Sequence, residues 1–190
     1  MDLYRLHNNE LEPVGKTAFD LEKDIQSLVE KNLGSLFSLE FVATEFSIDE
    51  FRIDTLAFDE ENNAFVIIEY KKGSSYSVVD QGYAYLSKML EKKADFVLEY
   101  QEQTGKALKK SDVDWTQSKV VFISPAFNAY QKNSVNFRDV PFELWEIKKY
   151  GKDLISLVQH KPSSKESTHH FQESNLVLVS TDFSDLPETF

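Results

Sequence analysis

The chain has 190 residues, among them 15 Phe, 8 Tyr and 2 Trp but no cysteine, and its formal net charge is −11. The aromatic content predicts one folded domain with a sizeable core and excludes a disordered chain, while the absence of cysteine excludes a disulfide scaffold, a thiolate zinc site and a cysteine nucleophile. No apolar run approaches the ~20 residues that span a bilayer, and the first residues lack the apolar region of a signal peptide, so we expect a cytoplasmic protein that does not enter a membrane.

The first predicted helix begins at Thr17, with Asp20 three residues later as the second member of a capping box. Apolar residues follow at helical spacing up to Gly34, a residue type that commonly ends helices. Residues 36–47 then alternate between apolar and more polar side chains, which predicts an extended segment.

The next passage is a predicted hairpin of residues 51–58 and 64–71, joined by the turn of residues 59–63 (DEENN). Residues 65–68 (FVII) are apolar at every position. An uninterrupted apolar run is typical of a central strand that is covered on both faces of its sheet.

A second helix is predicted after the break at residues 73–75, with Ser77 and Asp80 as capping residues. The residues of its predicted apolar stripe are Val79, Tyr83, Leu86 and Leu90, with Val78 and Met89 beside it. The residues of the opposite, polar stripe are Gln81, Tyr85 and Lys88. Residues 94–103 either extend this helix or form another.

Short strands are predicted at residues 119–124, 142–147 and 154–158. The succession of helices and strands predicts one α/β domain with a mixed sheet, and we place it at residues 1–160. Residues 161–190 are predicted to form a polar tail with a short apolar segment.

Two carboxylates and an ammonium group are predicted to converge in the hairpin. Asp54 and Glu69 are equally far from the centre of the turn, so a regular hairpin sets them opposite each other with Cβ atoms about 5 Å apart. Lys71 follows Glu69 by two residues and points to the same face. Opposed carboxylates repel unless a cation intervenes, and Mg²⁺ or Mn²⁺ suits them. With Lys71 stabilising charge on a phosphoryl group, such a cluster is suited to phosphodiester hydrolysis, although cross-strand charge pairs are also an ordinary surface feature.

Three segments together resemble the PD-(D/E)XK nuclease superfamily: residues 52–59 (RIDTLAFD), 66–73 (VIIEYKKG) and 80–83 (DQGY). Within it they are most similar to the group that contains archaeal-type mismatch and branched-DNA endonucleases and related bacterial domains. The resemblance covers about residues 17–150. Ile53 stands where the name-giving motif has proline, a replacement that is common in this group.

The resemblance implies a restriction-endonuclease-like core, which is a mixed central sheet flanked by helices. It implies that Asp54 and Glu69 bind the metal, with the Tyr70 carbonyl as a third ligand. The superfamily often places a glutamate of its first helix near the metal. Glu22 is the candidate for that role here, and a solvated helix glutamate is the alternative.

The resemblance also implies Lys71 as the catalytic lysine and Gln81 as an active-site helper, where a solvent-facing glutamine is the alternative. Together these residues predict a metal-dependent nuclease that acts on nucleic acid, with DNA as the first expectation. The alternative is a non-catalytic module of the same fold that binds nucleic acid or a protein. In one version of this alternative, the acidic first third of the chain mimics DNA and binds a basic partner.

The distribution of charge bears on the partner. A net charge of −11 disfavours nucleic acid, whose binding depends on neutralised phosphates, but residues 1–65 alone carry −10 and residues 66–110 carry +2. The sequence holds no counterpart of the separate DNA-binding domain of the similar nucleases. We therefore expect a protein partner that adds DNA affinity, and a homodimer, which the superfamily often forms, is left open.

Overall fold

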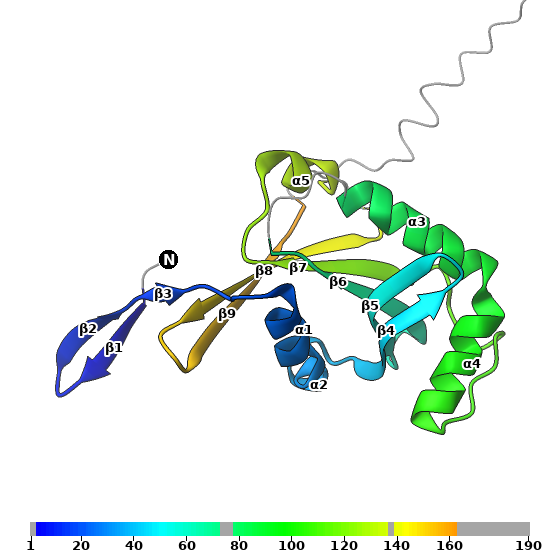
Figure 1. Cartoon of the computed structure of the whole chain (residues 1–190), viewed down its shortest axis with the longest axis horizontal. Helices are drawn as coiled ribbons and strands as arrows, with labels where there is room; N and C mark the ends of the chain where they lie inside the picture. The colour runs from blue at the N-terminus through cyan, green and yellow to red at the C-terminus, as the bar shows by residue number, and fades with distance from the viewer. Residues whose placement is uncertain (1–2, 73–77, 137–138, 163–190) are drawn as a thin grey trace, which may run out of the picture.

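The computed structural model describes residues 3–72, 78–136 and 139–162, and all structural statements refer to these residues. Within them, seven strands form one sheet in the order β3-β8-β7-β6-β5-β4, with β9 paired to β8 (Figure 1). These strands are β3 (Lys16–Thr17), β4 (Glu40–Ile48), β5 (Phe51–Asp59), β6 (Ala64–Tyr70), β7 (Lys119–Ser124), β8 (Phe142–Tyr150) and β9 (Leu154–His160). The helices are α1 (Glu22–Glu30), α2 (Leu33–Phe37), α3 (Val78–Glu91), α4 (Lys93–Thr104) and α5 (Ala129–Ser134).

The sheet is mixed, because β6, β7 and β8 run parallel while β4, β5, β3 and β9 pair antiparallel with their neighbours. Helices α1 and α2 lie on one side of it, and α3 and α4 lie on the other (Figure 1). The α/β class with a mixed central sheet flanked by helices, predicted from the sequence, is therefore confirmed. In the described part of the chain, no helix is both long and apolar enough to cross a bilayer.

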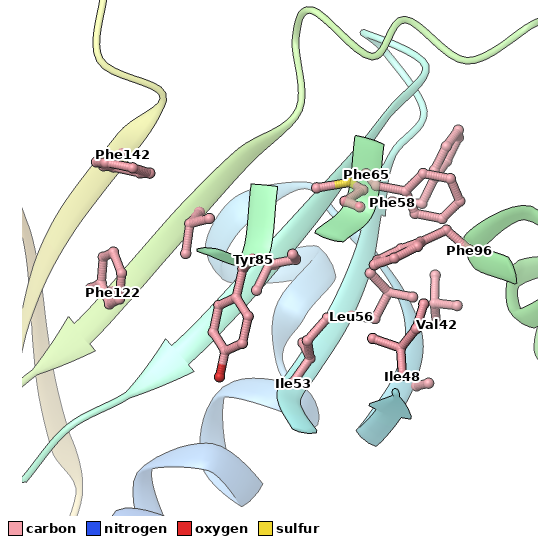
Figure 2. Close-up of a cluster of buried hydrophobic side chains, with 14 of the residues drawn as sticks. Val42, Ile48, Ile53, Leu56, Phe58, Phe65, Tyr85, Phe96, Phe122 and Phe142 are labelled. Atoms are coloured by element: carbon pink, nitrogen blue, oxygen red, sulfur yellow. The ribbon is translucent and has the colours of Figure 1, made fainter. Parts of the chain in front are cut away.

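Strand β6 is the centre of the sheet, and all of its residues are buried. Alternate side chains enter two separate cores, as the pleat of a strand requires. Phe65 and Ile67 join the core under α3 and α4, whereas Val66 and Ile68 join the core under α1 and α2. Figure 2 shows the first core, in which the ring of Tyr85 lies among apolar side chains. The predicted central strand, covered on both faces, is confirmed.

The prediction for the first helix is wrong at both ends. Thr17 lies in β3, paired with Lys149, and its hydroxyl donates to the Gly151 carbonyl at 3.1 Å. Helix α1 instead begins at Glu22, where the carboxylate of Asp24 accepts the Leu21 backbone N–H at 2.9 Å. Because Lys16 and Thr17 pair with a distant strand, the residues expected in the first helical turn lie outside the helix.

Gly34 was expected to end the first helix, but it lies inside α2. Helix α1 ends at Glu30, and the left-handed residue that closes the next helix is Ser38, with φ 56°. The extended segment predicted from residue 36 accordingly begins only at Glu40.

The predicted apolar stripe of α3 is confirmed only in part, because Val79 and Leu86 pack against the core but Tyr83 and Leu90 do not. Its buried residues are Val78, Gly82, Tyr85 and Met89. Tyr83 and Leu90, expected in the apolar stripe, are about half exposed at 51% and 49%. Tyr85, expected in the polar stripe, is buried. Gly82 faces Phe142 of β8 so closely that an added Cβ would lie 2.7 Å from the ring.

Other expectations divide in the same way. The strands at residues 119–124, 142–147 and 154–158 are present, two of them longer than predicted, and residues 93–104 form a separate helix. Sequence reasoning missed helix α5 and the hairpin of β1 (Leu3–His7) and β2 (Glu10–Val14), which projects from the body in Figure 1. The break at residues 73–75, the predicted cap Ser77 and residues 163–190 of the predicted tail lie outside the described residues.

Candidate active site

The hairpin of β5 and β6 sets the two carboxylates of the candidate site against each other. Thr55 pairs with Ile68, and the same register continued by one residue sets Asp54 opposite Glu69. The backbone N–H of Tyr70 donates to Asp54 Oδ2 at 3.0 Å, which ties the aspartate to the end of β6. Both carboxylates lie on the face of the sheet that α3 covers.

Glu69 is held through one of its two oxygens. Oε1 accepts hydrogen bonds from Lys71 Nζ at 2.8 Å and from Gln81 Nε2 at 2.7 Å. Glu69 is only 4% exposed, and its Oε2 is buried without a hydrogen-bond partner. A buried carboxylate oxygen without a partner is unfavourable, so this atom marks a place where a cation or donor would be stabilising. The structure thus brings together four of the residues singled out in the sequence, Asp54, Glu69, Lys71 and Gln81.

Asp54 lies in an environment that disfavours its charge. Burial, with the nearby charge of Glu69 added, raises the pKa of the Asp54 carboxyl from 3.8 to about 6. The hydrogen bond from Tyr70 and the charge of Lys71 oppose this rise without cancelling it. A bound divalent cation would relieve both causes, because it neutralises the charge that burial and repulsion penalise.

Tyr85 belongs to the site, a role that the sequence analysis did not give it. Its hydroxyl accepts a hydrogen bond from Gln81 Nε2 at 2.9 Å and donates to the Arg52 carbonyl at 3.1 Å. Burial and the charge of Glu69 raise the pKa of this phenol, so it stays neutral. Tyr85 follows Gln81 by one helical turn, the spacing by which the sequence placed both on one stripe of the helix. The phenol fixes the amide that in turn holds Glu69.

A polar network on the opposite face supports the same strands, and it too was missed. Gln26 of α1 is buried and donates to the Asp54 carbonyl at 2.8 Å and to Glu30 Oε1 at 2.9 Å. Thr55 donates to the same Glu30 oxygen at 2.6 Å and shares a hydrogen bond of 3.2 Å with the Tyr70 hydroxyl. The network therefore ties α1 to both strands of the hairpin directly behind the carboxylates.

Glu22 lies near the end of β6 but is not joined to the carboxylate pair. Its Oε1 accepts the backbone N–H of Lys72 at 2.7 Å. Helix α1 packs on the face of the sheet opposite to the one that carries Asp54 and Glu69. The role of Glu22 beside a metal, like that of the Tyr70 carbonyl as a ligand, stays a prediction.

The donor set bears on which cation the site suits. Within residues 3–72, 78–136 and 139–162, no group of three or more His, Cys, Asp or Glu side chains is placed to hold a metal. Asp54 and Glu69 alone offer carboxylate oxygens here, and they belong to a hard-oxygen set without nitrogen or sulfur. Mg²⁺ commonly binds through one or two carboxylates and keeps several waters, so this pair fits it better than a fully protein-ligated ion.

No protein-family model matches the chain. An uncharacterized protein of Haemophilus influenzae is 52% identical to it over 157 residues, which cover 83% of this chain and 52% of the relative. The chain therefore spans about half the length of this relative.

Three solved structures are distantly similar. A repair endonuclease from Pyrococcus abyssi has a TM-score of 0.38 at 15% identity, covering 70% of this chain and 50% of its own. A complex of EndoMS with double-stranded DNA has the same TM-score and identity, covering 72% of this chain and 54% of that chain. SfsA of Pyrococcus furiosus with Ca²⁺ has a TM-score of 0.33 at 14% identity, covering 67% and 60%. At such TM-scores these likenesses carry no argument about this chain.

Proposed function

We propose that this chain is a metal-dependent nuclease that hydrolyses phosphodiester bonds in DNA. The observation that carries the proposal is the state of Glu69: two donors occupy Oε1, while the buried Oε2 has no hydrogen-bond partner. Asp54 faces it across the hairpin, with its pKa raised by burial and by the charge of Glu69. The resemblance of the three sequence segments to PD-(D/E)XK nucleases supports the same assignment.

Asp54 and Glu69 are the residues that would hold Mg²⁺ or Mn²⁺, with the Tyr70 carbonyl as the further ligand that the resemblance implies. When bound, the ion would supply Lewis acidity toward the scissile phosphate and lower the pKa of a nearby water. The two carboxylates would lose the mutual repulsion that they have in the free protein.

The other side chains of the site have separable tasks in this proposal. Lys71, held at 2.8 Å from Glu69, would pair its ammonium with the negative charge that builds on a phosphate oxygen as the bond to phosphorus breaks. Gln81 and Tyr85 would keep Glu69 in a single orientation, so that the carboxylate needs no rearrangement when substrate arrives. Gln26 and Glu30 would hold the hairpin from behind.

Divalent-metal stabilisation tests the proposal first. Binding to the native state raises the melting temperature by mass action, so Mg²⁺ or Mn²⁺ should raise that of the wild type and not those of Asp54→Asn or Glu69→Gln. Glu61→Gln is the matched control, because it removes one exposed carboxylate from the turn at the far end of the same hairpin. That variant should respond like the wild type.

Cleavage of supercoiled plasmid and labelled oligonucleotides tests the chemistry itself. Lys71→Met should abolish cleavage while the protein remains folded and still binds metal. A wild type that neither cleaves nor gains stability with either metal, under conditions where Glu61→Gln behaves identically, would refute the nuclease assignment. That result would favour the alternative reading, a binding module of the same fold.

A further inference from the structure

A cleft lined by lysines lies at the same edge of the sheet as the candidate active site. Its volume is about 270 Å³, and it is lined by Lys16, Thr17, Ala18, Phe19, Lys72, Pro125, Ile147, Lys148 and Lys149. We call it the lysine groove. Four of its nine lining residues are lysines and none is acidic, in a chain whose net charge is −11.

The topology explains why the groove exists. Strands β7 and β3 both pair with β8, β7 along Phe142–Glu146 and β3 only at Lys149 and Tyr150. The edge of β8 between them is uncovered, and the groove lies over this gap, with Pro125 after β7 at one end and Lys16 of β3 at the other. Its lining combines apolar residues, among them the half-buried Phe19, with four lysines.

Only some lysines of the described chain are held in ion pairs. Lys88 and Lys92, which follow the site on α3 and just after it, are both bound to Asp49 at 3.2 Å. In the groove, Lys148 is paired with Glu146, but neither Lys16 nor Lys149 has a carboxylate within ion-pair distance among the described residues. Lys16 and Lys149 thus bring two positive charges without an ion pair to this cleft, while Lys149 also borders a neighbouring cleft lined by Asp20, Asp24 and Asp153.

The groove and the candidate active site approach the end of β6 from opposite faces of the sheet. Lys71 donates to Glu69 on the α3 side, while the ammonium of Lys72, which lines the groove, donates to the Asp20 carbonyl on the α1 side. The register sets Leu144 of β8 level with Glu69, two strands away, and Lys149 lies five residues further along β8. A polyanion in the groove would therefore reach the carboxylate pair several phosphates away from Lys149.

We propose that the lysine groove binds the phosphate backbone of the DNA whose cleaved phosphate lies at the Asp54–Glu69 site, several phosphates away. This inference rests on the proposed function. Lys16 and Lys149 neutralise phosphates of this backbone. The contacts are with the backbone and carry no sequence preference.

Binding measured in a Glu69→Gln background tests the groove separately from the chemistry, because cleavage does not consume the probe. The probe is a fluorescein-labelled DNA duplex, followed by anisotropy over a range of salt concentrations. Lys16→Gln with Lys149→Gln should weaken binding about tenfold and reduce the slope of log K against log salt by about 2, one phosphate per lysine. The double arginine variant should bind like the parent.

Lys109→Gln with Lys110→Gln is the matched control, because it removes two exposed lysines from a loop outside the groove. If both double variants bind alike, or if the parent binds no duplex at low salt, the groove proposal is overturned. A loss of affinity confined to an RNA duplex would overturn the assignment to DNA.

The two proposals can fail independently. A wild type that cleaves, together with a groove variant that binds and cleaves like its control, would overturn the groove and leave the nuclease assignment intact. A wild type that never cleaves, together with a groove variant that loses affinity and salt dependence, would support the groove and overturn the catalytic assignment. Melting curves of each variant establish that the comparison is between folded proteins.

Discussion

The side-chain amide of Gln81, on α3, donates a hydrogen bond of 2.7 Å to Glu69 Oε1, on the central strand. Lys71 donates to the same oxygen, so both donors hold the carboxylate from one side and leave Oε2 without a partner. The phenol of Tyr85 accepts from the same amide and fixes it. A helix thus sets the orientation of a carboxylate that belongs to a strand.

Gln81→Glu should destabilise the protein without metal and make divalent cations more stabilising. The variant replaces a donor to Glu69 by a second carboxylate in a buried place, and we expect a loss of about 1–3 kcal/mol in EDTA. Gln103→Glu is the control, because Gln103 donates to Glu99 at 2.9 Å in the same way but on an exposed helix, where like charges one turn apart cost only about 0.5 kcal/mol or less. Chemical denaturation with and without Mg²⁺ measures both, and equal losses would contradict the buried geometry.

Because of Asp54, the unfolding free energy of the metal-free protein should fall as the pH rises from about 4 to 6. Its pKa is raised to about 6 in the folded state, above 3.8 for the free side chain, so the folded protein binds the additional proton in this range. The stability that this proton contributes is fully present below pH 3.8 and is lost as the pH passes through 6. Urea unfolding in EDTA should show that wild type loses stability relative to Asp54→Asn over this range. A difference that does not change with pH would contradict the raised pKa.

Thr55→Val should destabilise the hairpin from behind the site. The hydroxyl of Thr55 is buried between Glu30 and Tyr70, and its removal leaves both of those groups short of a partner. We expect a loss of about 1–3 kcal/mol in unfolding free energy. Thr44→Val is the comparison, since Thr44 is exposed and only accepts from Gln26 at 3.1 Å. Should the two variants lose the same stability, the network behind the site would not contribute as described.

Gly82→Ala should destabilise the protein although alanine is the better helix former. A Cβ at this position would lie 2.7 Å from the buried ring of Phe142, and overpacking of this kind costs about 1–3 kcal/mol. Gly34→Ala is the opposite case, because nothing lies within 4 Å of its added Cβ and helix propensity should make it stabilising by up to about 1 kcal/mol. Thermal unfolding distinguishes them, and Phe142→Leu should restore part of the loss at Gly82.

The features predicted well from the sequence are local ones. The hairpin of β5 and β6 follows from an uninterrupted apolar run and a short turn, and the same register sets Asp54 opposite Glu69. The contact between Lys71 and Glu69 needs only the two-residue period of a strand. Strand β7, which pairs parallel with β6, and strand β8, which pairs parallel with β7, were recognised as strands, although their order was not predicted.

The features predicted badly depend on partners far along the chain. Thr17 pairs with Lys149 of β8, and no local sequence pattern predicts that pairing. Gly82 of α3 faces Phe142 of β8 closely, and the face of the helix that hydrophobicity alone selected is partly exposed. Gln26 was missed for the same reason, because its target is a backbone carbonyl of another element.

The short pairing of β3 affects the order in which the parts of this molecule unfold. Only Lys16 and Thr17 join it to β8, and a connection across most of the chain is costly to close because loop-closure entropy grows with length. The carboxylate pair, in contrast, is closed by one short turn. Mild denaturant should therefore release β3 in a partial opening before the hairpin unfolds. If both proposals hold, this opening would separate the two proposed activities, because the groove would be disrupted while the carboxylate pair stays intact.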